Sequence, residues 1–297
     1  MPSPQTYQLL DFGDGRKLEQ FGPLRLDRPC PGMQQVPRAE PVLWESADAR
    51  FTGTSANAGE WESRRELPER WTIRYGLSAM ELKRCESGHV GLFPEQAENW
   101  DWLERHVQSA GESIRVLNLF AYTGGSTLVC AAAGAEVTHV DAARNVVAWA
   151  RRNAELSGLA EARIRWIAED AGKFVRREAR RGSIYDAVIL DPPSYGHGPK
   201  GEVWRLSRHL PRLLALCAEL TAGQCRFVLL TCHTPGYEPP RLEALVRDAF
   251  GESMQGRWSS GIMKLRTPAG RELPSGVAVR WAGDPRRAAA SRRAGGC

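Results

Sequence analysis

The chain has 297 residues, 42% of them hydrophobic, and a formal net charge of +5. This length allows one large core with a smaller unit attached, and no stretch approaches the eighteen successive apolar residues of a membrane-spanning helix. The seven cysteines are scattered and form no Cys-x-x-Cys pair, which indicates reduced thiols in a cytoplasmic protein and argues against a zinc site or a disulfide framework. The positive charge permits a polyanionic partner without requiring one.

Residues 1–85 differ from the rest of the chain because they are rich in proline, glycine and tryptophan and have no long helical period. Short alternating segments and the Asp14-Gly15 turn signal predict a small β-rich unit. A further hairpin is expected from residues 80–83 and 89–93. The apolar stripe along residues 95–106 then predicts an amphipathic helix.

From residue 113 apolar strands alternate with helices. Strands are expected at residues 114–120, 137–140, 163–167, 185–190 and 226–231, with closing strands near 258–264 and 277–281. Helices are expected at 126–133, 143–156, 172–181, 203–220 and 241–250. The alternation predicts an α/β fold, a Rossmann-like, doubly wound, seven-stranded and mostly parallel sheet. We therefore expect a β-rich unit at 1–85, the α/β domain at 86–283, and a basic, disordered tail at 284–297.

A glycine pair follows the first strand of this alternation, in Tyr122-Thr123-Gly124-Gly125. Glycines let a ligand approach the backbone, and the helix that follows offers unpaired N–H groups. The second strand ends at Asp141, where a carboxylate can accept hydrogen bonds from two ribose hydroxyls. The Gly-x-Gly-x-x-Gly pattern of a dinucleotide site is absent. The pattern indicates a nucleoside without a pyrophosphate, and S-adenosylmethionine fits this description.

Asp170 comes just after the third strand and has two interpretations. Its carboxylate could receive the amino group of the adenine ring, or it could cap the helix that follows.

Asp191-Pro192-Pro193-Ser194-Tyr195 follows the fourth strand and is the most informative motif of the chain. The two prolines hold a stiff, extended backbone at the carboxyl end of the strand, which is the edge where open α/β sheets bind their ligands. A carboxylate and an aromatic ring at this edge can hold a flat substrate by hydrogen bonding and stacking. A plain proline turn after a strand is the other interpretation.

Residues 118–126, 140–159 and 191–204 together resemble class I S-adenosylmethionine-dependent methyltransferases. They are similar in particular to the bacterial large-subunit ribosomal RNA methyltransferases that modify cytosine or guanine. Residues 91–96, Gly-Leu-Phe-Pro-Glu-Gln, are similar to the Gly-Phe-Phe-x-Asp-Gln segment of that branch. The likeness covers about residues 80–283, and the PUA domain common in the branch is not recognisable. The resemblance implies methylation of a base in RNA, with cofactor contacts from Asn118, Tyr122, Thr123, Gly124, Gly125, Asp141 and Asp170.

Two chemistries remain open for the methyl acceptor. In related enzymes, Asp/Asn-Pro-Pro-aromatic loops hold an exocyclic amine, and Asp191, Pro192 and Tyr195 would take this role. The alternative is carbon 5 of cytosine, which needs a thiolate to add to carbon 6. The loop after the fifth strand resembles the nucleophile loop of RNA cytosine-5 methyltransferases, with Cys232 as the nucleophile. Free cysteines at strand ends are otherwise small buried hydrophobes.

Other functions compete with RNA methylation: transfer to a protein or a small molecule, a nucleotide-dependent oxidoreductase, and a non-catalytic cofactor-binding scaffold. The missing glycine fingerprint argues against the oxidoreductase. The cations Lys200, Arg205 and Arg208 follow the diproline; they suit RNA phosphates or form an ordinary exposed helix face. No metal and no membrane partner is expected.

Overall fold

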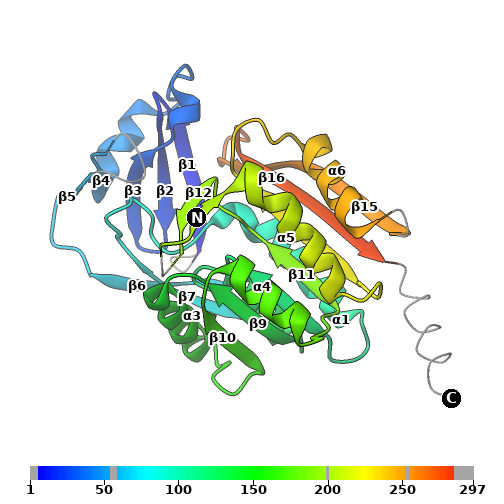
Figure 1. Cartoon of the computed structure of the whole chain (residues 1–297). Coiled ribbons are helices and arrows are strands. Elements are labelled where there is room, and N and C mark those ends of the chain that lie inside the picture. The colour runs from blue at the N-terminus through cyan, green and yellow to red at the C-terminus, as the bar shows by residue number, and fades with distance from the viewer. Residues whose placement is uncertain (1–5, 54–58, 199–200, 252–253, 284–297) are drawn as a thin grey trace, which may run out of the picture. The chain divides into compact units, whose positions relative to one another are not determined.

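The computed structural model describes residues 6–53, 59–198, 201–251 and 254–283, and the chain divides into two compact units (Figure 1). The first contains Met1–Glu95 and Lys264–Pro274, and the second contains Gln96–Met263 and Ser275–Cys297. This division differs from the expected boundary at residue 85, because the first unit runs further and includes a segment near the C-terminus. The tail expected at 284–297 lies outside the described residues.

The first unit is β-rich, as the sequence predicts. Its main sheet has the order β1-β2-β3-β4-β5, with β1 (Tyr7–Gly13), β2 (Arg16–Phe21), β3 (Leu24–Pro29), β4 (Ala49–Phe51) and β5 (Trp61–Ser63). Three short 3-10 helices are η1 (Pro31–Met33), η2 (Pro41–Ser46) and η3 (Pro94–Gln96), the last of which ends in the second unit.

The hairpin expected from residues 80–83 and 89–93 does not form as two strands, although Lys83 N donates to Val90 O (3.1 Å) and Cys85 N donates to His89 O (2.9 Å). Strand β7 (Ser78–Lys83) pairs with β6 (Arg70–Tyr75) instead. Residues 89–93 form no strand, because the left-handed backbone of Gly88 (φ 78°) and Gly91 (φ 97°) interrupts the extended conformation. The Tyr75–Ser78 pairing closes a tighter and more local hairpin.

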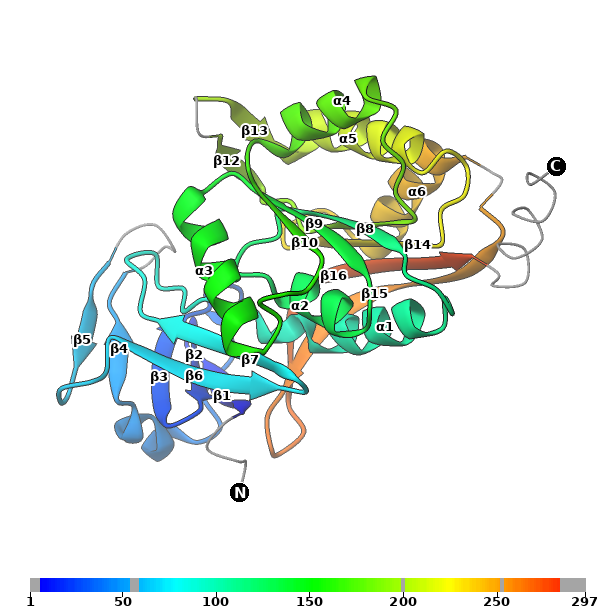
Figure 2. The same cartoon turned by 90° about the horizontal axis from the view of Figure 1, so that it is seen from below.

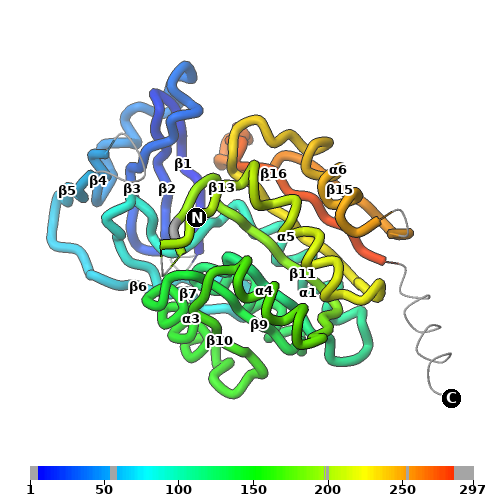
Figure 3. Tube along the Cα trace, in the orientation of Figure 1, coloured from blue at the N-terminus to red at the C-terminus, as the bar shows by residue number. Residues whose placement is uncertain are grey.

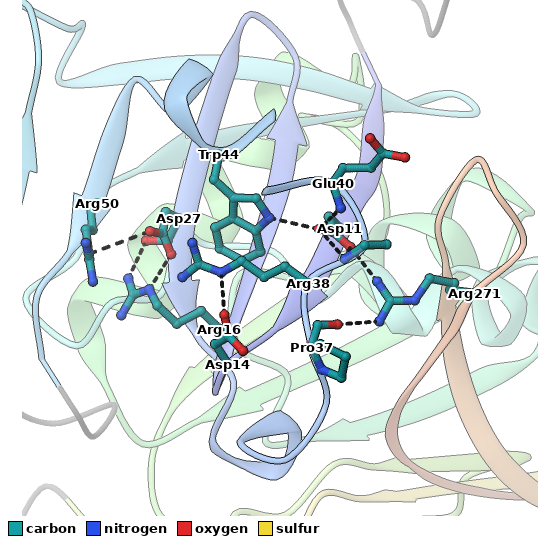
Figure 4. A network of polar contacts seen from close by, with 11 residues as sticks. Asp11, Asp14, Arg16, Asp27, Pro37, Arg38, Glu40, Trp44, Arg50 and Arg271 are labelled. Atoms are coloured by element: carbon teal, nitrogen blue, oxygen red, sulfur yellow. Dashed lines mark hydrogen bonds and ion pairs between the residues drawn. The ribbon is translucent and has the colours of Figure 1, made fainter. Parts of the chain in front are cut away.

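Asp11 is the anchor of a polar network inside the first unit (Figure 4). Its carboxylate accepts hydrogen bonds from the backbone N–H groups of Ala39 (3.1 Å) and Glu40 (3.0 Å), from Trp44 Nε1 (2.9 Å) and from Arg271 Nη1 (2.6 Å). The residue is only 1% exposed, and a buried carboxylate is tolerated only when donors surround it. The network therefore fixes the loop at 39–44 and the segment at 264–274 to β1.

The second unit contains the predicted seven-stranded sheet, in the order β10-β9-β8-β11-β14-β16-β15. The first five of these strands are mutually parallel, and β16 runs antiparallel to β14. The bounds are β8 (Arg115–Leu119), β9 (Glu136–Asp141), β10 (Ile164–Ala168), β11 (Ala187–Leu190), β14 (Phe227–Cys232), β15 (Gly256–Arg266) and β16 (Glu272–Gly283). All four residues of β11 are buried, as its continuous apolar run predicts.

Helices cover both faces of this sheet (Figure 2). One face carries α1 (Ala97–Gln108), α2 (Gly125–Ala132) and α3 (Arg144–Leu156), and the other carries α4 (Ala171–Arg180), α5 (Leu206–Leu220) and α6 (Pro239–Phe250). The Cα trace in Figure 3 follows the strand–helix alternation along the chain. None of the helices in the described residues is long and apolar enough to cross a membrane.

The helix expected at 203–220 begins later than predicted. Residues 203–205 form β13 (Val203–Arg205), which pairs with β12 (Tyr195–His197) in a small antiparallel hairpin, and α5 begins at Leu206. A three-residue ladder is too short to show a period of two in the sequence, so the pattern did not reveal it.

Candidate active site

The candidate site lies at the carboxyl ends of the parallel strands, where the strand order reverses. Strands β9 and β10 follow on one side of β8, whereas β11 and β14 follow on the other. Leu119, the last residue of β8, pairs with Leu190, the last residue of β11. The glycine loop and the diproline motif therefore begin at neighbouring points of one edge, which is where ligands bind in open α/β sheets.

The loop from β8 to α2 has an unusual backbone. Phe120 (φ 56°) and Tyr122 (φ 50°) are both in the left-handed region, as is Gly124 (φ 93°). Bulky residues adopt this conformation at a cost and only when the surrounding structure imposes it, and such residues cluster at binding sites. The loop is held in place by hydrogen bonds from Ala121 N to Val140 O (3.1 Å) and from Gly124 N to Ala121 O (3.0 Å).

The two glycines of this loop also have a packing reason that the sequence did not reveal. A Cβ atom on Gly125 would lie 2.6 Å from the Trp100 ring, and one on Gly124 would lie 3.3 Å from Ala150 Cβ. Trp100 belongs to α1 and Ala150 to α3. Close packing of two helices thus requires small residues here, in addition to any approach by a ligand.

Asp141 ends β9 with a carboxylate that two backbone groups hold in place. Its Oδ2 accepts from Tyr122 N and its Oδ1 from Ala143 N, both at 3.0 Å. Burial raises the pKa of Asp141, and the backbone N–H groups act in the opposite sense. Each carboxylate oxygen can accept a second hydrogen bond, so the partly exposed side chain can still receive ribose hydroxyls.

Asn118 and Thr123 are both buried. Asn118 Nδ2 donates to Thr127 Oγ1 (2.9 Å), which lies 2.9 Å from His139 Nδ1. The carbonyl of Thr123 accepts from Asn153 Nδ2 (2.9 Å). These hydrogen bonds hold the loop against the neighbouring elements of the second unit. Direct contact of Asn118 or Thr123 with the cofactor stays a prediction.

Asp170 caps α4, because its Oδ1 accepts a hydrogen bond from Lys173 N at 2.8 Å. The helix-cap interpretation is therefore observed. The adenine contact stays a prediction, and it would use the second carboxylate oxygen.

Asp191 is held by side chains from distant parts of the second unit. Its Oδ2 accepts from Gln96 Nε2 (3.1 Å), and its Oδ1 accepts from Thr231 Oγ1 (2.6 Å). His233 Nε2 lies 3.8 Å from the same Oδ1. The Asp191 side chain remains 29% exposed, so one side of a fixed carboxylate is open.

The diproline loop is rigid beyond what its two prolines impose. Trp204 Nε1 donates to Pro193 O (2.7 Å), and the Trp204 ring packs on Phe120 with a centroid distance of 4.9 Å. Pro192 is buried, whereas Tyr195 is 52% exposed. An exposed ring at this edge of the sheet can stack on a flat ligand.

Cys232 does not have the environment of a ready nucleophile. It is 1% exposed, and its Sγ accepts from Thr234 N at 3.4 Å. Burial raises the pKa of the thiol, and the Asp191 charge adds to this effect, while the hydrogen bonds from Thr234 oppose it. A thiol, rather than the thiolate that adds to carbon 6, is therefore the favoured state.

Sequence reasoning missed the partners of Asp191. Gln96 occurs in the 91–96 segment that resembles the methyltransferases, which was the one available signal. Asn99 and Arg280, which connect to Gln96, carry no local signature because they meet it only in the folded second unit. In the described residues no group of three or more His, Cys, Asp or Glu could hold a metal ion.

Comparison with known proteins identifies the family of the chain. An S-adenosylmethionine-dependent methyltransferase from Agrobacterium tumefaciens is 39% identical and superimposes with a TM-score of 0.88 over 94% of this chain and 90% of that chain. A proposed methyltransferase of this kind from Streptococcus mutans, 16% identical with a TM-score of 0.73, covers 94% of this chain and 76% of its own and shares the fold.

Two curated relatives are ribosomal RNA methyltransferases. Large-subunit methyltransferase I of Aeromonas hydrophila is 35% identical over 62% of this chain and 48% of its own length. Large-subunit methyltransferase K/L of Chromohalobacter salexigens is 26% identical over 73% of this chain and 31% of its own length. The chain thus spans half or less of these relatives. Residues 47–239 match the model of the S-adenosylmethionine-dependent methyltransferase family, so the chain belongs to this family and S-adenosylmethionine is its cofactor.

Proposed function

We propose that this enzyme transfers a methyl group to a base in RNA, most readily ribosomal RNA. The observation that carries the proposal is the acceptor side of the site: a fixed, partly exposed Asp191 carboxylate, followed after the rigid diproline by the exposed ring of Tyr195. A base offers both a flat face for stacking and edge groups for hydrogen bonding. Such an acceptor also implies a cytoplasmic location.

Two further observations support an RNA acceptor. Arg205, Arg208 and Arg212 follow the diproline hairpin and are exposed, as phosphate contacts require. The curated relatives named above act, by their names, on ribosomal RNA. Lys200, which the sequence suggests for the same role, lies outside the described residues.

The loop residues fit the cofactor. The partly exposed Asp141 would accept the ribose hydroxyls, the loop of Tyr122, Thr123 and Gly124 would lie against the amino-acid part, and Asp170 would receive the adenine amino group. When bound, S-adenosylmethionine supplies an electrophilic methyl group on its sulfonium. The role of this chain is then to present the acceptor atom to that methyl group.

We favour an exocyclic amine as the acceptor over carbon 5 of cytosine. The partly exposed Asp191 carboxylate can accept a hydrogen bond from an amine N–H and so orient the nitrogen lone pair. Carbon 5 would need Cys232 as a thiolate, and its burial opposes this state.

The acceptor class is tested by methyl transfer. Purified enzyme, tritiated S-adenosylmethionine and large-subunit ribosomal RNA from cells lacking the gene should give labelled RNA, and nucleoside mass mapping then names the base. Label in protein or small molecules, with none in RNA, would contradict the proposal.

Cys232 decides between the two acceptor atoms. With an amine acceptor, Cys232→Ala should keep most of its transfer rate, and RNA carrying 5-fluorocytosine should trap no denaturation-resistant adduct. An adduct that forms with the wild type and is lost in Cys232→Ala would instead establish carbon 5 chemistry.

A further inference from the structure

A chain of hydrogen bonds connects Arg280 in β16 to Asp191 across the second unit. Arg280 Nε donates to Asn99 Oδ1 (2.7 Å), Asn99 Nδ2 donates to Gln96 Oε1 (2.6 Å), and Gln96 Nε2 donates to Asp191 Oδ2 (3.1 Å). Every donor points the same way, from a guanidinium toward a carboxylate.

The direction of this chain is set by the chemistry of its ends. A guanidinium has donors only, so Asn99 must turn its oxygen toward Arg280 and its nitrogen toward Gln96. Gln96 must then present its oxygen to Asn99 and its nitrogen to Asp191. Both oxygens of Asp191 act as acceptors, from Gln96 and from Thr231, so the series of hydrogen bonds ends at this carboxylate.

The side-chain amides of Asn99 and Gln96 are buried, which indicates that this series of hydrogen bonds has a function other than packing. Asn99 is 0% exposed and Gln96 is 6% exposed. Buried polar groups cost free energy unless they are hydrogen-bonded, and apolar residues of the same size fill such space as well or better. Burial also lowers the pKa of Arg280, and Glu98, whose carboxylate lies 3.9 Å from its guanidinium, has a side chain that is 74% exposed.

Thr231 fixes the second oxygen of the Asp191 carboxylate. Its hydroxyl donates to Asp191 Oδ1 at 2.6 Å, and Gln96 Nε2 also lies 3.3 Å from Thr231 Oγ1. Both oxygens of Asp191 are thus fixed from the protein side, which sets the plane of the carboxylate and leaves its open side for the acceptor.

We propose that Arg280, Asn99 and Gln96 are positioning residues for methyl transfer, which hold the Asp191 carboxylate in one orientation toward the acceptor. The inference rests on the proposed role of Asp191 at the acceptor. In this proposal the three residues act on the reaction through Asp191.

Kinetics with matched variants test the effect on transfer. Gln96→Leu and Arg280→Met should lower kcat about 10- to 100-fold, the range for losing a hydrogen bond to a charged group. The KM for RNA and the affinity for S-adenosylhomocysteine should change less than about threefold. Arg280→Lys keeps a donor and should retain more activity than Arg280→Met.

Two controls separate positioning from general damage. Gln108→Leu makes the same exchange at the exposed end of α1, where Gln108 bonds Glu104, and Glu98→Gln removes only the ion pair of Arg280. Both should keep wild-type kcat. An active wild type with Gln96→Leu within twofold of its kcat would overturn the inference.

A readout independent of activity covers variants that fail to fold and an unidentified substrate. Side-chain N–H signals of Gln96, Asn99 and Arg280 are followed by ¹⁵N NMR in the wild type and in Asp191→Asn. A continuous chain predicts that the Asn99 and Arg280 signals shift although neither residue touches Asp191; unmoved signals refute the inference. If these signals shift but the enzyme methylates no RNA, the hydrogen-bond series from Arg280 to Asp191 is supported and the proposed function is rejected.

Discussion

Asp11 in the first unit and Asp191 in the second are both carboxylates that accept hydrogen bonds from residues far away in the sequence, yet their surroundings differ. Asp11 is 1% exposed and receives donors from backbone, indole and guanidinium on several sides. Both oxygens of Asp191 accept hydrogen bonds from buried side chains, but 29% of the Asp191 side chain is exposed. A carboxylate enclosed by donors is an anchor, whereas one that is fixed on one side and open on the other can act on a ligand.

The strongest test of this contrast is Asp191→Ala. We expect kcat to fall about 10³- to 10⁴-fold, at the upper end of what a positioned acid–base group contributes, while S-adenosylhomocysteine affinity stays within about threefold. Steady-state kinetics and calorimetry measure the two quantities, and urea unfolding should show little loss of stability. Normal turnover would mean that the diproline loop is structural.

The corresponding test in the first unit is Asp11→Ala. Removing the carboxylate leaves Arg271 and the Trp44 indole without their acceptor, so unfolding in urea should show a loss of about 3–5 kcal/mol, the cost of breaking a buried charged pair. Asp14→Asn is the control, because Asp14 is exposed and its ion pair with Arg38 should contribute no more than about 1 kcal/mol. Equal effects of the two substitutions would remove the distinction between anchor and surface pair.

Asp141 lies between the two extremes, with two backbone donors and partial exposure. Asp141→Ala should weaken S-adenosylhomocysteine binding by about 1.5–3 kcal/mol per lost hydrogen bond to the charged group, measured by calorimetry on folded protein. Unchanged affinity, or tight binding of NAD by the wild type, would contradict the assignment of the ribose site.

The pH dependence of stability gives the smallest effect. Burial acts to raise the pKa of Asp11, but hydrogen bonds from Trp44 and from backbone N–H groups outweigh it, so the pKa lies below the usual value of an aspartate. The ionised form is favoured by folding, so this contribution is present above the unfolded-state pKa and is lost as the pH falls through the folded-state pKa. Urea midpoints between pH 6 and pH 3 should therefore fall less steeply in Asp11→Asn than in the wild type, and identical slopes would contradict this.

Much of the second unit was predictable from the sequence because its signals are local. The buried run of β11 predicted a two-sided strand, and the ends of β9 and β11 predicted the places of Asp141 and Asp191. The hydrogen bond from Gln96 to Asp191 was not predictable, because the two residues are 95 positions apart in the sequence. Likewise, no periodicity reveals that Trp100 lies against Gly125 or that β12 pairs with β13. Local patterns predict elements and edges, whereas partners arise from packing between elements.

The bond between Asp11 and Arg271 spans 260 positions, and this has a consequence for the order of folding. During synthesis the N-terminal strands leave the ribosome long before Arg271 exists, so their buried carboxylate must wait for its cation. A fragment ending at residue 95 would lack that partner permanently, together with Leu265 and Leu273, which pack with Leu9 and Phe12. The first unit is therefore completed only after residues 96–263 of the second unit have been synthesised, so its final folding must wait for the segment that follows them.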